Sequence, residues 1–159
     1  GLNRTQNSHI LQIRSDVPEE MAGIMWLCIG GPTFTPYIPF FANMNETDPS
    51  FNNTSMTYNK DDAWWYYKSL AALVESHYPQ FVQLDTKYLE ELNRYYRGRV
   101  EEIIENAKDL SGEELTDYLT RENQKTVAHT KKDSEELMGQ MFTDAIKMSK
   151  LTFKMDPNL

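Results

Sequence analysis

The chain has 159 residues and a formal charge of −8 at pH 7, from 16 basic and 24 acidic side chains. This length suits one domain with a sizeable core, and contents of 40% hydrophobic and 12% aromatic residues exclude a largely disordered chain. The negative charge argues against a nucleic-acid backbone or an anionic membrane as the partner, and no apolar run reaches the length of a membrane span.

Residues 1–30 carry two strand patterns. The segment NSHILQIR alternates polar and apolar residues, and AGIMWLCIG is a short, almost continuous apolar run. We therefore expect strands near residues 8–14 and 22–29, antiparallel to each other or adjacent in one sheet. Two strands do not make a stable sheet alone, so at least one edge is expected to pair with another chain or to stay bare.

Residues 31–61 are predicted to form a long loop. Four prolines interrupt regular structure there, and a cluster of Asn, Asp, Ser and Thr between positions 43 and 57 favours turns. Loops of this length inside a compact domain are usually functional or disordered. The aromatic side chains near its start favour an ordered loop that wraps over a surface.

Residues 62–159 have a helical pattern that predicts about three helices. Asp61 or Asp62 can cap the first helix, which is expected to end before Pro79. A second, longer helix follows from apolar residues at helical spacing, and the capping-box sequence SGEE at residues 111–114 opens a third. The polar stretch 120–136 has almost no apolar residue and is predicted to be a solvated face.

The chain contains no phosphate-binding glycine loop, no paired Cys for zinc and no GxSxG motif. Its three histidines lack the spacing of metal ligands, so neither a metal nor a cofactor is expected. The single cysteine, Cys28, lies in an apolar strand, where a free thiol is typically a small buried hydrophobic residue and not a nucleophile.

Two arginines flank the first predicted strand. Arg4 and Arg14 are candidate binding residues because a guanidinium can hold a carboxylate through two parallel hydrogen bonds. The alternative, that both arginines make ordinary surface ion pairs, is equally consistent with the sequence.

Three segments, taken in order, resemble the C-terminal part of the bacterial dipeptidase A family: NRTQNSHILQIR, WLCIGGPTFTPYIPFF and DDAWWYYKSL. Members of this family are cysteine dipeptidases of the N-terminal nucleophile hydrolase superfamily. The resemblance covers residues 3 to about 75 and is specific in the combination of its motifs. It implies an α+β fold, the C-terminal portion of an αββα arrangement in which helices sandwich two antiparallel sheets.

The resemblance also implies a function. The parent enzyme hydrolyses dipeptides with an N-terminal Cys exposed by processing, whose own α-amino group can serve as the base. This chain begins with Gly1, so we expect the nucleophile and most of both sheets in an upstream part of the same hydrolase, and no activity from this chain alone. The expected partners are that upstream part and a dipeptide, with possible homo-oligomers through exposed strand edges, in the bacterial cytoplasm.

On this resemblance Arg4 is the candidate catalytic residue, because a cation near the nucleophile would bind the substrate carboxylate or stabilise developing negative charge. Arg14, Gly30, Gly31 and Phe34 are the candidate substrate-binding residues. Glycines permit close approach of the backbone to a ligand, and the aromatic loop would line the substrate cleft.

A second hypothesis is a self-contained binding or assembly module without catalysis. Three helices would then close over a two-stranded ribbon, and the aromatic loop would meet a partner. A stable monomer in gel filtration favours the module, whereas aggregation or an edge-paired oligomer favours the hydrolase fragment.

Overall fold

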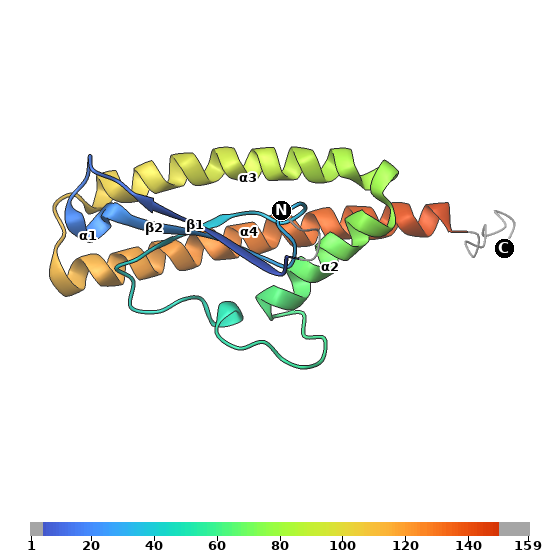
Figure 1. Cartoon of the computed structure of the whole chain (residues 1–159), viewed down its shortest axis with the longest axis horizontal. Coiled ribbons are helices and arrows are strands. Elements are labelled where there is room, and N and C mark those ends of the chain that lie inside the picture. Colours follow the sequence, from blue (N-terminus) through green and yellow to red (C-terminus); the bar gives the residue numbers. More distant parts are fainter. Residues whose placement is uncertain (1–4, 150–159) are drawn as a thin grey trace, which may run out of the picture.

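The computed structural model describes residues 5–149 (Figure 1). Within them, one antiparallel sheet has the strand order β1-β2-β3, with β1 at Asn7–Ile13, β2 at Gly23–Ile29 and β3 at Ile38–Phe41. A short helix, α1 (Glu19–Ala22), joins β1 to β2, and a 3-10 turn, η1 (Pro49–Phe51), follows β3. The remaining elements are the helices α2 (Ala63–Ser76), α3 (Tyr78–Ala107) and α4 (Gly112–Met148).

Both strands predicted near the start of the chain are confirmed. They pair antiparallel, from Asn7 opposite Ile29 to Ile13 opposite Gly23. The prediction of only two strands is wrong, because part of the expected loop forms β3, which pairs antiparallel with β2. Pro39 is tolerated there because β3 is an edge strand, which needs fewer backbone donors.

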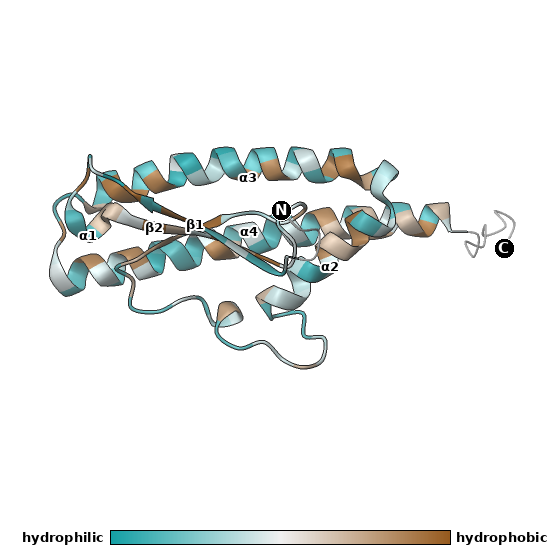
Figure 2. Ribbon diagram, in the orientation of Figure 1, coloured by the Kyte–Doolittle hydropathy of each residue, from teal (hydrophilic) through white to brown (hydrophobic). Residues whose placement is uncertain are grey.

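The long helices α3 and α4 run side by side along the molecule, with the sheet against them and α2 packed near one end (Figure 1). Hydrophobic residues gather on the faces that these elements turn toward one another (Figure 2). One buried cluster joins β3 to the three long helices, and a second lies where β2 meets the turn between α3 and α4. No helix described between residues 5 and 149 is both long and apolar enough to cross a membrane.

The predicted helix boundaries are confirmed to within a few residues. The Asp62 carboxylate caps α2 by accepting a hydrogen bond from the backbone N–H of Trp64 (3.1 Å). The helix ends at Ser76, and Pro79 lies in the first turn of α3, where a missing N–H costs nothing. Helix α4 begins directly after Ser111, although the Ser111 side chain makes no capping hydrogen bond.

The prediction that residues 120–136 form a solvated face is wrong for one side of α4. Thr130 and Ser134 are fully buried against α3. The Tyr96 hydroxyl lies 2.8 Å from Thr130 Oγ1, and the Tyr88 hydroxyl lies 2.7 Å from Ser134 Oγ. Small hydroxyl side chains therefore let the two helices approach and leave the buried tyrosine hydroxyls paired.

Strand β1 is the least covered element of the fold. Of its seven residues only Ser8 is partly buried, and the exposed fractions are 56% for Ile10, 71% for Leu11 and 85% for Ile13. Because neighbouring side chains of a strand point to opposite faces, Ile10 and Leu11 show that β1 is open on both faces. Its outer edge has no strand partner in the described part of the chain.

Candidate functional site

A cleft with a volume of about 290 Å³ opens where the chain leaves β2. Its walls come from the turn after β2, from α2 and from the first residue of α3, and its lining consists of Gly30, Gly31, Pro32, Thr33, Phe34, Lys68, Ala71, Glu75 and Tyr78. The structure therefore brings together three of the residues predicted to bind substrate, namely Gly30, Gly31 and Phe34. Arg4, the candidate catalytic residue, lies outside the described residues.

Gly30 fixes how closely the turn approaches α2. Its φ is +94°, a left-handed conformation that other residues rarely adopt, and a Cβ at this position would lie 2.8 Å from the backbone N of Lys68. The same Cβ would lie 2.8 Å from the carbonyl carbon of Tyr67. Glycine is therefore required here by contact with the α2 backbone, and this contact forms one end of the cleft.

Thr35 and Cys28 hold the turn from its buried side. The Thr35 hydroxyl oxygen lies within hydrogen-bond distance of the carbonyl oxygens of Ile29 and Gly31, at 2.9 and 2.8 Å. Cys28 Sγ lies 3.0 Å from Thr35 Oγ1, and the residue is completely buried, which raises the pKa of its thiol. Cys28 is therefore a core residue, as predicted, in surroundings that disfavour a nucleophilic thiolate.

Two side chains of opposite charge line the cleft from α2. Lys68, Ala71 and Glu75 follow one another at spacings of three and four residues, so they share one face of the helix. In the described part of the chain, neither the Lys68 nor the Glu75 side chain forms an ion pair or a hydrogen bond. The cleft therefore offers one uncommitted cation and one uncommitted anion.

An aromatic pair closes one side of the same cleft. The rings of Phe34 and Tyr78 meet edge to face, with 6.2 Å between their centroids. Phe34 was predicted as a site residue, whereas Lys68, Glu75 and Tyr78 were not. The signal was available in the spacing of Lys68 and Glu75, but the aromatic residues of the same helix favoured a helix covered on most of its faces.

Arg14 lies at the opposite end of the β1-β2 pair. Its guanidinium donates to both carboxylate oxygens of Asp16, at 3.0 and 2.5 Å, and to the Glu101 carboxylate of α3, with 3.3 Å between Arg14 Nη2 and Glu101 Oε2. Hydrogen bonds to Asp16 and then to Glu101 raise the pKa of the Arg14 guanidinium above its ordinary value. Since a strand rises roughly 3.3 Å per residue, Arg14 is roughly 20 Å from the cleft along β1 and is not brought into it.

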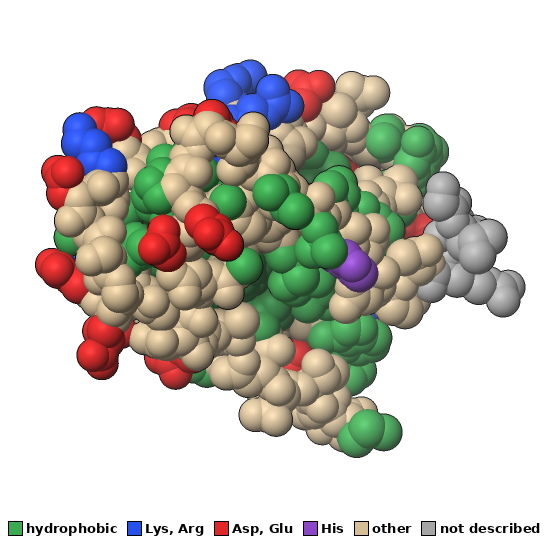
Figure 3. Space-filling model, turned by 60° about the vertical axis from the view of Figure 1, so that its left-hand side comes forward, with side chains coloured by type: hydrophobic (Ala, Val, Ile, Leu, Met, Phe, Trp, Pro, Cys, Tyr) green, Lys and Arg blue, Asp and Glu red, His purple; other side chains and the backbone are tan. Residues whose placement is uncertain are grey.

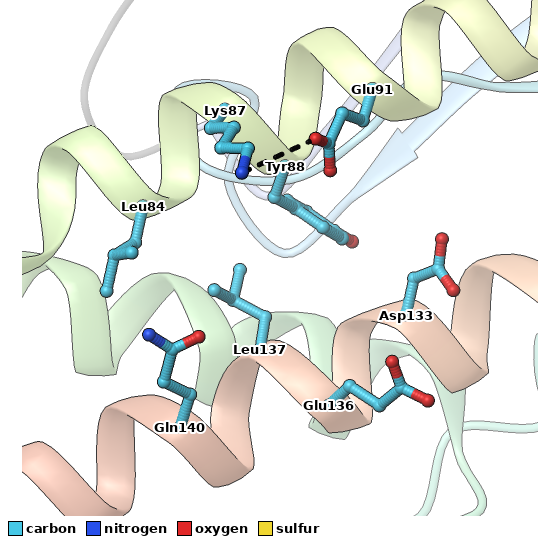
Figure 4. Close-up of a pocket in the computed structure, with 8 residues that line it drawn as sticks. All are labelled: Leu84, Lys87, Tyr88, Glu91, Asp133, Glu136, Leu137 and Gln140. Carbon is cyan, nitrogen blue, oxygen red and sulfur yellow. Dashed lines mark ion pairs between the residues drawn. The ribbon is translucent and has the colours of Figure 1, made fainter.

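A second cleft, of about 300 Å³, lies between α3 and α4 (Figure 4). It is lined by Leu84, Lys87, Tyr88, Glu91, Asp133, Glu136, Leu137 and Gln140. Figure 4 shows Lys87 turned toward Glu91 on its own helix, where the two form an ion pair of 3.8 Å. The Tyr88 hydroxyl is already paired with Ser134, so this gap between helices offers a ligand less than the cleft at Gly30.

No group of three His, Cys, Asp or Glu side chains that could hold a metal ion occurs within residues 5–149. The cleft at Gly30 offers groups that can bind a ligand: an approachable backbone turn, an aromatic wall and two opposite charges. Among the described residues, no activated nucleophile faces it, because Cys28 lies buried behind the turn.

Comparison with known proteins gives a consistent family. The sequence model of peptidase family C69 matches residues 1–91 of this chain. A probable dipeptidase of Latilactobacillus sakei is 39% identical over 162 aligned residues, which cover 100% of this chain and 33% of the relative. A probable dipeptidase B of Lactococcus lactis subsp. lactis (strain IL1403) is 34% identical over 96% of the chain and 32% of the relative.

Dipeptidase A of Lactobacillus helveticus is 36% identical over 89% of the chain and 30% of the relative. The chain thus spans about a third of the length of these bacterial relatives. The family match covers more than half of the chain and includes β1, the cleft and α2. The chain belongs to peptidase family C69.

Proposed function

We propose that this chain is the C-terminal part of a cysteine dipeptidase of the N-terminal nucleophile hydrolase superfamily, with its nucleophile in an upstream part of the same protein. The thiolate of an N-terminal Cys attacks the peptide carbonyl, the amine of the second residue leaves with a proton, and water then hydrolyses the acyl-enzyme. The dipeptidase names of the relatives and the share of their length that the chain spans support this proposal.

The observation that carries the proposal is the bare strand β1. An aliphatic strand open on both faces and along one edge is a surface for association, since such edges otherwise invite pairing with other chains. In an αββα arrangement, further strands would continue the sheet at β1, and a second sheet would cover exposed side chains of β1 such as Leu11 and Ile13. Hydrophobic side chains open to solvent are also visible across the face shown in Figure 3.

The cleft after β2 is the proposed substrate site. Gly30, Gly31 and Phe34 line it, and the upstream part would supply the wall that carries the nucleophile. Arg4 is proposed to stabilise charge at the scissile group. The carboxylate partners of Arg14 support a strap between β1 and α3 better than a contact with substrate.

The bacterial sources of the relatives and the single cysteine support a bacterial cytoplasmic location, because free thiols persist in reducing compartments. No cofactor is required by the proposed reaction, since the thiol and the α-amino group of the nucleophilic residue supply the chemistry.

The alternative is a binding or assembly module without catalysis. It is favoured by the two buried clusters, which give the helices a core of their own. Association separates the two functions. If the chain is part of a hydrolase, mixing it with a separately produced upstream part should give a one-to-one complex in gel filtration. Leu11→Lys in β1 should weaken this complex. A stable monomer that does not bind the upstream part would favour the binding or assembly module.

A further inference from the structure

We infer that Lys68 and Glu75 recognise the two charged ends of a free dipeptide in the cleft after β2. Lys68 would pair with the terminal carboxylate, and Glu75 would pair with the terminal ammonium. The inference rests on the proposed dipeptidase function and adds the groups that select free dipeptides over longer or blocked peptides.

The spacing of the two charges fits this ligand. Lys68 and Glu75 are seven residues apart on α2, so their backbones are separated by about 10 Å at 1.5 Å per residue. The terminal charges of an extended dipeptide are about 7 Å apart, since each residue spans at most about 3.6 Å. Both side chains line the same cleft, so a dipeptide lying along this face of α2 can reach both charges, whereas each additional residue would displace one terminus by about 3.5 Å.

Small residues line the cleft between the two charged side chains. Ala71 lies between Lys68 and Glu75 on the same face of α2, and a Cβ on Gly31 would lie in ordinary contact, 3.5 Å, with the Ala71 Cβ. Small residues on both sides of this contact leave room for the backbone of a ligand. The volume of about 290 Å³ is at the lower end of small-molecule sites and suits a ligand of dipeptide size.

The charges are available for a ligand. Other lysines of the chain are already paired, as shown by Lys131 with Asp61 (3.1 Å) and Lys125 with Glu122 (2.7 Å). Lys68 and Glu75 form no such pair in the described part of the chain, so binding a zwitterion breaks no existing ion pair. A ligand with one charge of each sign also leaves the net charge of the cleft unchanged.

The experiment titrates the complete protein, isotope-labelled in this 159-residue segment and with its upstream nucleophilic Cys changed to Ser, and follows backbone amide shifts by NMR as peptides are added. The probes are Ala-Leu, its C-terminal amide, its N-acetyl derivative and Ala-Ala-Leu. We expect Ala-Leu to shift the amides of Gly30 and Gly31, and each of the other three probes to bind about tenfold more weakly, because each loses one charge-assisted contact.

Variants then assign each end. Lys68→Met should raise the Kd for Ala-Leu about tenfold but leave the Kd for the amide unchanged, because the amide has no carboxylate to lose. Glu75→Gln should likewise raise the Kd for Ala-Leu about tenfold but leave the Kd for the N-acetyl derivative unchanged, because that derivative has no terminal ammonium to lose. Lys108→Met and Glu105→Gln, which break an exposed ion pair at the end of α3, are matched controls and should leave every Kd unchanged.

Several outcomes would overturn the inference: no shift with Ala-Leu, equal binding of blocked and free peptides, or equal binding by both cleft variants. The blocked-peptide arm needs no variant, so a folding failure of Lys68→Met does not remove the test. Hydrolysis by the complete protein is measured separately. An absence of hydrolysis would contradict the dipeptidase function. Hydrolysis at the parent rate by both cleft variants would contradict only the role of Lys68 and Glu75.

Discussion

Gly30 lies against the first half of α2 so closely that a Cβ on it would be 2.8 Å from the backbone N of Lys68. Gly30→Ala should therefore destabilise the chain by about 2 kcal/mol, from the strained positive φ together with the contact. Urea unfolding followed by circular dichroism measures the change. Gly98→Ala is the matched control in α3, where a Cβ meets nothing within 4 Å, and it should stabilise the chain by about 1 kcal/mol. Equal stability of the two variants would contradict this contact.

The buried hydroxyl pair between α3 and α4 gives a second prediction. Thr130→Val keeps the shape of the side chain but leaves the Tyr96 hydroxyl without its partner at 2.8 Å, which should cost about 2 kcal/mol of unfolding free energy. Adding Tyr96→Phe should recover part of this loss, since both polar groups are then gone. Thr143→Val, at an exposed position of the same helix, should change stability little. A loss at Thr143 as large as that at Thr130 would argue against a specific pair.

Variants at Arg14 distinguish a structural role of this residue from a role in substrate binding. If its guanidinium straps β1 to α3, Arg14→Ala and Glu101→Ala should each lower the thermal midpoint slightly, and the difference from the parent chain should shrink in high salt. In the complete enzyme, KM for dipeptides should then stay near the parent value. A KM raised about tenfold or more by Arg14→Ala, with Glu101→Ala unaffected, would instead support the sequence prediction that Arg14 binds substrate.

Asp85 should make stability depend on pH. It is buried in α3, its Oδ1 has no hydrogen-bond partner in the described structure, and burial raises the pKa of its carboxyl to about 7. The folded state therefore holds a proton that the unfolded state releases near its ordinary value of 3.8. Stability should fall as pH rises from about 4 to about 7, and the loss should level off above that range.

Asp85→Asn removes this titration, so the variant should gain stability relative to the parent chain as pH rises. Urea midpoints between about pH 4 and pH 8 give the difference directly. Asp109→Asn, at an exposed position after α3, should run parallel to the parent. Parallel curves for Asp85→Asn as well would mean that Asp85 ionises as readily in the folded chain as in the unfolded one.

The sequence was sufficient for the elements with a clear period. The alternation of β1, the apolar run of β2 and the cap at Asp62 all lie where they were expected. Strand β3 was missed because its four residues contain Pro39 and are buried on both faces, so they show neither alternation nor a turn signal. The buried side of α4 was missed because hydroxyl residues pack there through partners on α3, which periodicity of apolar residues does not report.

The candidate site was predictable only where its residues are close together in the sequence. Gly30, Gly31 and Phe34 are neighbours in the sequence, so their shared place in the cleft follows from a single turn. Lys68 and Glu75 join them only because Gly30 packs on α2, a contact between segments nearly forty residues apart. Arg14 looked like a partner for a ligand carboxylate, but the fold provides Glu101 from α3, which no local pattern announces.

The most direct measurement is hydrolysis of Ala-Leu by this chain with and without the upstream part of the protein. We expect no hydrolysis by the chain alone, and hydrolysis once the chain is combined with an upstream part processed to expose its N-terminal Cys. Changing that upstream Cys to Ser should abolish the activity, whereas Cys28→Ala should leave it nearly intact because Cys28 is a core residue. Hydrolysis by the chain alone, abolished by Cys28→Ala, would contradict the account.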